Sequence, residues 1–151
     1  MNKDEKYEII FKYKDLVLDT GILIEYLGAP DAESIKWLDE FIFTENSQFL
    51  LHSHEINRTE ILYLICRKKG MKNALNIVKS MEKFIFFHND PEISEIAGNI
   101  KCKYSIALAD CFSIATGTWL KSPIIFKKEH ELENSVIKSI ENEFNVKLVV
   151  F

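Results

Sequence analysis

The chain has 151 residues, of which 47% are hydrophobic, and a formal net charge of −4 at pH 7. This length suits one domain with a sizeable core, and the negative charge excludes a protein that holds nucleic acid through a bulk positive field. The first residues are acidic where a signal peptide is basic, and no apolar run approaches the roughly 20 residues of a membrane span. Three cysteines without a CxxC pair fit a reducing compartment. We therefore expect a soluble, cytoplasmic protein with no membrane segment.

Short apolar runs of strand type alternate with helical patterns along the whole chain, which we read as a single domain, 1–151, with an N-terminal extension, 1–14. The predicted strands are 16–18, 48–51, 84–87, 123–126 and 146–150. The predicted helices are 22–28, 32–43, 56–69, 71–83, 91–101 and 106–120. This alternation predicts an α/β fold whose five-stranded, mainly parallel sheet is covered on both faces. Ligand sites in such sheets lie at the carboxyl ends of the strands.

Asp19 follows the first predicted strand, where an open α/β sheet presents its ligand crevice. Thr20 adds a hydroxyl that could bind a phosphate oxygen or a water molecule on a metal ion. Asp-Thr before a helix is also a common N-cap, so only neighbouring residues can decide between the two roles. Asp-Thr-Gly is the triplet of aspartic proteases as well, but those sites lie in all-β surroundings and a helical pattern follows here, which excludes that reading.

Two further acids stand inside helical patterns. Glu60 has Asn57 three residues before it, so the pair could form a capping box instead of a site. Asp110 is the only charged residue between Ser105 and Lys121, and burying a lone carboxylate costs several kcal/mol, roughly, unless a cation or hydrogen-bond donors compensate it. Lys101 or Lys103 could supply an ion pair. A divalent cation could instead satisfy several acids together, and oxygen-only ligands favour magnesium or manganese over zinc.

The chain resembles the PIN-domain family, and more narrowly the VapC-like toxins of toxin–antitoxin pairs. Three segments carry the resemblance: residues 16–20 (LVLDT), residues 56–63 (INRTEILY) running into 67–70 (RKKG), and residues 107–116 (ALADCFSIAT). The resemblance implies a three-layer α/β/α fold and a magnesium- or manganese-dependent endoribonuclease whose metal ligands are Asp19, Glu60 and Asp110. It also implies an RNA substrate, a homodimer and inhibition by a small antitoxin protein.

The sequence departs from the family pattern at two places. The family often has Ser where this chain has Ala107, and it has a fourth acid, usually Asp, just after the fourth strand. Lys128 or Glu129 takes that place here, and we assign Glu129 as the fourth catalytic residue. The departure leaves open an alternative in which the chain is a non-catalytic or RNA-processing PIN-like module that acts by binding a partner or RNA.

Three other patterns have less specific meanings. Arg67 and Lys68, in a basic cluster with Lys69 and Lys72, are candidates for contacts with RNA phosphates, although basic residues at a helix end commonly only complement its dipole. His52 and His54 share one strand face, but no third zinc ligand follows at a recognisable spacing, so packed or solvated histidines are favoured. The aromatic run 84–87 is assigned to the core. Tyr63, Leu64 and Trp37 are expected to contribute apolar surface to a dimer.

Overall fold

The computed structural model describes residues 1–28, 36–128 and 132–151. Five strands form one sheet in the order β3-β2-β1-β4-β5, and every pair of neighbours is parallel. The strands are β1 (Asp15–Leu18), β2 (Leu50–His54), β3 (Ile85–His88), β4 (Ile124–Phe126) and β5 (Leu148–Val150). The helical elements are α1 (Lys3–Ile10), α2 (Thr20–Gly28), the π-helical segment η1 (Leu38–Ile42), α3 (Glu55–Lys69), α4 (Met71–Met81), α5 (Pro91–Lys103), α6 (Leu108–Leu120) and α7 (Asn134–Phe144).

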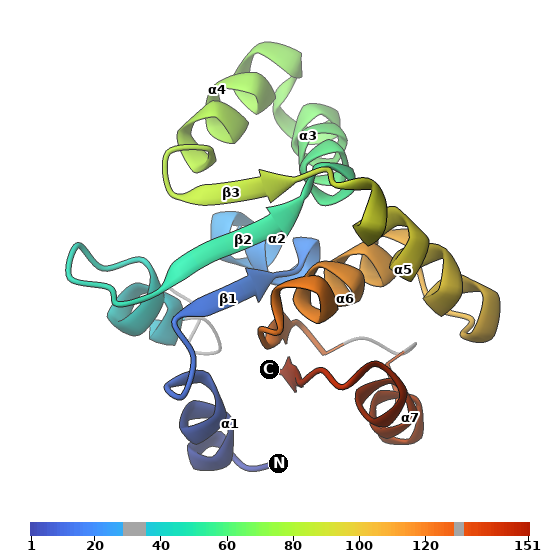
Figure 1. Cartoon of the computed structure of the whole chain (residues 1–151). Coiled ribbons are helices and arrows are strands. Elements are labelled where there is room, and N and C mark those ends of the chain that lie inside the picture. The colour runs from blue at the N-terminus through green and yellow to red at the C-terminus, as the bar shows by residue number, and fades with distance from the viewer. Residues whose placement is uncertain (29–35, 129–131) are drawn as a thin grey trace.

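Successive side chains of each central strand enter two different cores, because they point to opposite faces of the sheet. Leu18 and Ile125 pack with residues of α1 to α4 and η1, whereas Val17 and Ile124 pack with residues of α5, α6 and α7. Figure 1 shows α2 behind the sheet and α6 in front of it. The predicted three-layer α/β/α architecture with five parallel strands is therefore confirmed. None of the described helices is long and apolar enough to cross a membrane.

Two helices lie where the sequence analysis assigned none. The N-terminal extension contains α1, whose Ile10 is buried and whose Tyr7 ring contacts the rings of Trp37 and Phe151. Residues 134–144 form α7, whose Ile140 is fully buried against the sheet. Helix α1 has little amphipathic pattern, whereas α7 places Val136, Ile137, Ile140 and Phe144 at helical spacing, a pattern that was not used to predict a helix. The N-terminal segment is therefore part of the packed domain.

Three aromatic assignments need correction. Within the run 84–87, Phe84 and Phe86 are 52% and 63% exposed, so the prediction of a wholly buried strand is wrong. Phe84 lies in the turn before β3, and Phe86 lies on β3, which is an edge strand of the sheet. Trp37 is only 4% exposed and stacks on Phe151, so it is a core residue and cannot supply dimer surface. Of the predicted helix 32–43, residues 32–35 lie outside the described residues, and 38–42 form η1.

The carboxyl end of β1 is fixed between its neighbours. The backbone N–H of Asp19 donates to the carbonyl of Ile125 on β4 at 3.1 Å, which extends the β1–β4 ladder by one bond. Helix α6 crosses above this ladder, and Gly117 makes the close approach possible. A Cβ at Gly117 would overlap the Ile124 side chain and lie 2.9 Å from the carbonyl oxygen of Ser122. The glycine therefore sets how near α6 comes to the beginning of β4.

Candidate active site

A pocket of about 300 Å³ opens at the carboxyl end of β1, and acidic side chains from separate elements line it. Asp19 follows β1, Glu60 comes from α3 and Asp110 comes from the first turn of α6. The full described lining is Asp19, Thr20, Gly21, Ile24, Glu25, Glu60, Leu64, Ala107, Asp110 and Lys127. The structure thus brings the three acids identified in the sequence to one pocket, although 91 residues of chain separate the first from the last.

Asp19 is 2% exposed, and hydrogen bonds hold both of its carboxylate oxygens. Ser113 Oγ on α6 donates to Oδ1 at 2.6 Å, and the backbone N–H of Gly21 donates to Oδ2 at 2.9 Å. The bond from Gly21 is the one an N-cap residue accepts at the start of a helix. Asp19 therefore caps α2 and lines the pocket at the same time, so the two interpretations of this residue are compatible.

Asn57 is the hub of the network around Asp19. Its side chain is fully buried, and Nδ2 lies 2.8 Å from Ser113 Oγ, 3.1 Å from Thr20 Oγ1 and 3.5 Å from Asp19 Oδ1. Because Ser113 donates its hydroxyl hydrogen to Asp19, its oxygen is the acceptor toward Asn57. The network joins α3, α6 and the end of β1, and it holds the Asp19 carboxylate in one orientation.

The capping-box interpretation of Asn57 and Glu60 is wrong. Helix α3 begins at Glu55, and His54 is its N-cap, accepting from the backbone N–H of Ile56 at 3.1 Å. Asn57 is therefore already inside the helix, one turn before Glu60, which leaves Glu60 to face the pocket. Nothing in the local sequence distinguishes this arrangement from a capping box, because the histidine cap is the less usual choice at this position.

The sequence left open an ion pair between Asp110 and either Lys101 or Lys103. Asp110 is 5% exposed. Lys103 forms an ion pair with Glu143, and Lys101 Nζ donates to the carbonyl of Ile106 at 2.6 Å. Both lysines thus have described partners other than Asp110, whereas the cation that lines the pocket beside it is Lys127. The ion pair with Lys101 or Lys103 therefore stays an alternative to metal ligation for Asp110.

The charge on Asp19 is costly in this setting. Burial raises the pKa of Asp19 from 3.8 to about 6, the bonds from Ser113 and Gly21 oppose that rise, and the negative charge of Glu60 adds to it. Desolvation and a like charge both disfavour the ionised carboxylate. A cation bound in the pocket would relieve both effects, so the raised pKa is what an acidic cation-binding site without its cation is expected to have.

The donor set suits a hard divalent ion, because the described lining offers carboxylate oxygens and neither sulfur nor imidazole. Asp19, Glu60 and Asp110 are the residues that would hold it. Among the residues that the structure describes, no three His, Cys, Asp or Glu side chains already form a group able to hold a metal ion. A bound cation would offset the repulsion between these like-charged carboxylates and allow them to approach one another.

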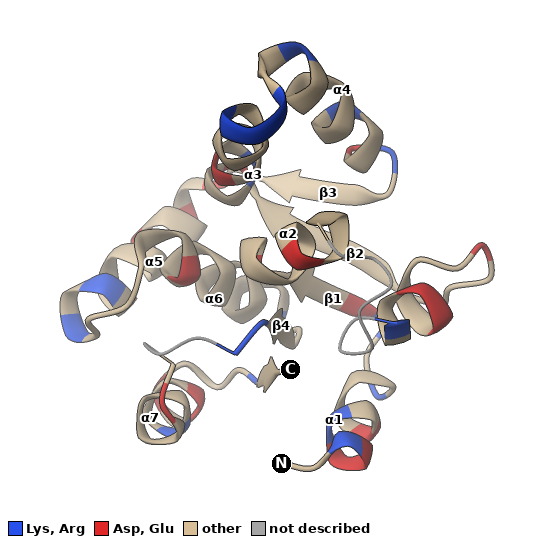
Figure 2. Cartoon of the chain, turned by 180° about the vertical axis from the view of Figure 1, so that it is seen from behind, with Lys and Arg blue, Asp and Glu red and all other residues tan. Residues whose placement is uncertain are grey.

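The remaining predicted residues fall at different distances from this pocket. Thr20 lines it and is 4% exposed. Lys68 lines a neighbouring groove, and the Arg67 guanidinium lies 4.8 Å from the centre of the Tyr63 ring. Figure 2 shows the basic stretch where α3 ends and α4 begins. Glu129, assigned as the fourth acid, lies outside the described residues. Asn57, which the sequence suggested only as part of a capping box, belongs to the site. Ser113, Glu25 and Lys127 also belong to it, and no sequence pattern had singled them out.

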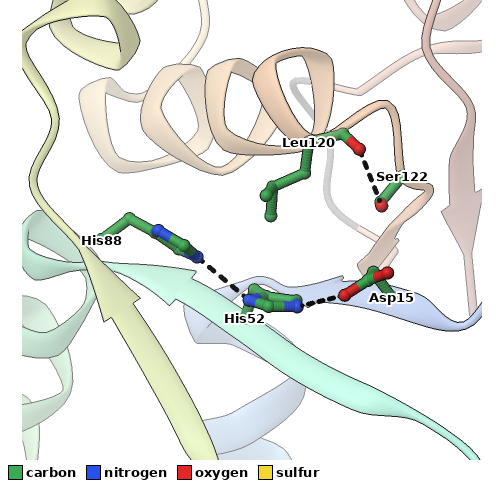
Figure 3. Close-up of polar contacts among 5 residues, drawn as sticks. All are labelled: Asp15, His52, His88, Leu120 and Ser122. Carbon is green, nitrogen blue, oxygen red and sulfur yellow. Dashed lines mark hydrogen bonds and ion pairs between the residues drawn. The ribbon is translucent and has the colours of Figure 1, made fainter.

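The histidines form a second polar cluster away from the pocket (Figure 3). His52 lies between two partners, with its Nδ1 3.0 Å from His88 Nε2 and its Nε2 2.7 Å from Asp15 Oδ1. The His54 ring packs on Phe112, with 4.4 Å between ring centres. His52 and His54 thus lie in the packed surroundings that the sequence pattern favoured.

The chain matches a known protein family, and its fold is similar to several solved structures. The PIN domain family matches residues 16–134. A VapBC2 complex of Rickettsia felis bound to a promoter DNA fragment superposes with a TM-score of 0.64 at 12% identity, over 90% of this chain and 98% of that one. DNA-bound VapBC of Salmonella typhimurium gives 0.62 at 11% identity, over 91% and 98%. A toxin–antitoxin complex of Klebsiella pneumoniae gives 0.57 at 15%, over 79% and 91%. No curated protein sequence matches the chain.

The fold, the pocket at the end of β1 and the family match agree, and the chain belongs to the PIN domain family. Proteins of this family are nucleases in general and generally use divalent metal ions. The similarity to solved structures, at identities of 11% to 15%, extends to the fold alone.

Proposed function

We propose that this chain is a magnesium- or manganese-dependent endoribonuclease and the toxin of a toxin–antitoxin pair. The observation that carries the proposal is the convergence of Asp19, Glu60 and Asp110 on one pocket at the carboxyl end of the central strand. A bound divalent ion would polarise the scissile phosphate and make a coordinated water molecule more acidic. The cytoplasm, where RNA is abundant, is the compartment that this activity requires.

The chain's own residues have separable tasks in this proposal. Asp19, Glu60 and Asp110 provide the negative charge that holds the ion, and Ser113 and Asn57 keep the Asp19 carboxylate in one orientation. Thr20 Oγ1 accepts from Asn57 at 3.1 Å, so its hydroxyl hydrogen is available to a phosphate oxygen. Arg67 and Lys68 would contact RNA phosphates beyond the pocket.

The test is cleavage of structured RNAs by the purified full chain with magnesium, with manganese and with EDTA. We expect cleavage with either ion and none with EDTA. Magnesium binding, measured by calorimetry, should be lost in Asp19→Asn and retained in Glu95→Gln, an exposed acid on α5 that serves as the matched control. RNA binding by the wild type without any metal-dependent cleavage would favour the alternative, a binding module.

An apolar groove beside the pocket supports an antitoxin partner. The groove encloses about 330 Å³ and is lined by Ile24, Leu27, Leu64, Ile65 and Ile77, with Gly28, Lys68 and Lys69. Ile24 and Leu64 also line the carboxylate pocket, so an occupant of the groove would lie at the pocket's entrance. Apolar walls beside two lysines fit an amphipathic segment with acidic residues.

The partner proposal is tested with the product of the small reading frame expected just upstream of this gene. We expect that product to form a complex with the chain and to block RNA cleavage, and we expect Leu64→Asp to weaken the complex. A complex that forms equally well with Leu64→Asp would place the partner elsewhere. A homodimer is proposed as well, with Tyr63, 42% exposed, as candidate surface. A monomer by light scattering at high micromolar concentration would count against it.

A further inference from the structure

Lys127 directly follows β4 and enters the carboxylate pocket from the side opposite α6. In the β1–β4 pairing Leu18 is the partner of Ile125, so the residues after both strands, Asp19 and Lys127, lie at the same edge of the sheet. The Lys127 Nζ is 3.4 Å from Oε2 of Glu25, which projects from α2. Figure 2 shows the basic stretch immediately after β4 in the view from behind. From the sequence, Lys128 and Glu129 were the residues predicted to matter at this end of β4.

The described lining of the pocket has more acidic than basic side chains. Its described lining holds four carboxylates, from Asp19, Glu25, Glu60 and Asp110, and a single basic side chain, from Lys127. An entering phosphodiester brings another negative charge, and one divalent ion does not neutralise four acids. The substrate therefore needs a further positive group near the scissile phosphate, and Lys127 is the group that the described lining provides.

The ion pair between Lys127 and Glu25 does not commit the lysine to a structural role. The Lys127 side chain is 46% exposed and that of Glu25 is 22% exposed. Exposed pairs of this kind contribute little to stability, because water screens them and both long side chains lose freedom. The ammonium can therefore exchange the Glu25 carboxylate for a phosphate oxygen at small cost, and it carries three hydrogens with which to donate.

We propose that Lys127 binds a non-bridging oxygen of the scissile phosphate and supplies positive charge at the end of β4, where the family pattern has its fourth acid. This inference rests on the proposed nuclease function. Glu25 holds the ammonium at the pocket until substrate arrives. The lysine then offsets negative charge that develops on the phosphate during cleavage.

Lys128 is a matched control in the neighbouring position. Successive residues after a strand project to opposite sides, and Lys128 lines a different cavity, of about 480 Å³, together with Lys6 and Lys138. The backbone N–H of Lys128 donates to the carbonyl of Phe151 at 2.7 Å, which a side-chain substitution leaves in place. Substitution of either lysine by Met removes one positive charge and keeps an unbranched side chain. The two variants therefore differ only in which cavity loses the charge.

The test measures RNA affinity in EDTA, where cleavage is absent, for the wild type, Lys127→Met, Lys127→Arg and Lys128→Met. The logarithm of the RNA-binding constant falls linearly with the logarithm of the salt concentration. Loss of one phosphate contact makes this dependence shallower, by about 0.7 in the slope for single-stranded nucleic acid. We expect that loss in Lys127→Met, a near-normal slope in Lys127→Arg and no change in Lys128→Met. With magnesium, Lys127→Met should cleave at least about tenfold more slowly and bind the ion no more weakly, since removal of a positive charge favours cation binding.

The possible failures are distinguishable. If the wild type cleaves RNA with magnesium and Lys127→Met matches it in rate and in salt slope, the assignment of Lys127 is overturned and the nuclease proposal stands. A lowered melting temperature of Lys127→Met with an unchanged salt slope also overturns it, because that result describes a structural ion pair. If the wild type shows no metal-dependent cleavage, the proposed function fails and this assignment fails with it.

Discussion

The carboxylate pocket and the histidine cluster both place ionisable side chains among apolar ones, yet burial shifts the pKa values of their residues in opposite directions. At Asp19 burial raises the pKa to about 6, and at His54 burial lowers the pKa to about 4. A buried histidine is neutral at pH 7 and needs no counter-ion, whereas a buried carboxylate is at least partly charged there. Burial therefore leaves His54 uncharged and in no need of a counter-ion, whereas it leaves the acids in need of a cation, so charge balance favours the pocket as the candidate metal site.

The largest expected effect is that of Asp110→Asn, which removes one charge from the pocket and keeps the shape of the side chain. We expect RNA cleavage to fall by at least about 100-fold, because even the loss of a residue that only supports a metal ligand costs 10 to 100-fold. The melting temperature without metal should stay the same or rise, since the charge is unfavourable there. The measurements are a cleavage assay with magnesium and a thermal melt in EDTA.

Two outcomes would contradict this reading of Asp110. A clear loss of stability with activity retained would mean that the carboxylate serves a buried ion pair, whose disruption costs roughly 3 kcal/mol. Loss of both stability and activity would mean that the substitution disturbs α6. Glu95→Gln, on the exposed side of α5, controls for the general effect of removing one negative charge.

The second prediction uses pH to separate the two regions. The raised pKa of Asp19 stabilises the metal-free fold fully below about pH 3.8, and that contribution is lost as pH rises through about 6. The two values differ by about two units, which corresponds to roughly 3 kcal/mol. The depressed pKa of His54 acts in reverse: its contribution is present above pH 6.5 and is lost as pH falls through about 4.

Melting temperatures in EDTA from pH 7.5 to 4.5 check these signs. We expect Asp19→Asn to lose more stability than the wild type as pH falls, because the favourable protonation of Asp19 is gone. His54→Asn, which keeps a side chain able to cap α3, should lose less stability over the same range. Parallel curves for the wild type and both variants would show that neither group titrates as its burial implies.

The third prediction concerns Asn57→Ala, which removes the hub of the network and leaves the lining acids in place. We expect a loss of about 1 to 3 kcal/mol in unfolding free energy, because the buried acceptors that Nδ2 serves lose a donor. Cleavage should fall as well, since Asp19 loses part of its support. Double-mutant analysis with Ser113→Ala checks the origin of the effect: strong non-additivity indicates one network, and additive losses would contradict it.

The smallest expected effect is that of His52→Gln. The hydrogen bonds of His52 to His88 and Asp15 are part-buried, so we expect a loss of about 1 kcal/mol in stability. RNA cleavage should stay within about twofold of the wild type, because a cluster that is merely packed has no part in the chemistry. Added zinc should leave the melting temperature unchanged. A zinc-dependent rise of several degrees would give the histidines a metal-binding role.

The sequence predicted the three-layer fold, and the three acids that it identified line one pocket, because each lies in a strongly apolar context that fixes its element. The supporting residues were harder to predict. Asn57 imitates a capping box, and only the tertiary position of α3 shows that it faces Asp19. The position of Lys127 in the pocket could be predicted only with the register of β4 against β1 and the placement of the lysine beside Glu25 on α2. The exposure of Phe86 could be predicted only with the knowledge that β3 is an edge strand.

The network behind Asp19 also bears on how the protein is made. Asp19 and Asn57 are 38 residues apart in sequence, and Asp19 and Ser113 are 94 apart. The central strand β1 completes its pairing only with β4, at residues 124–126. Contacts of such long range form late and slowly, since loop closure precedes their stabilising contribution. A growing chain on the ribosome therefore cannot assemble the pocket before most of the domain has emerged. Nascent and truncated copies should lack nuclease activity, whatever acids they already contain.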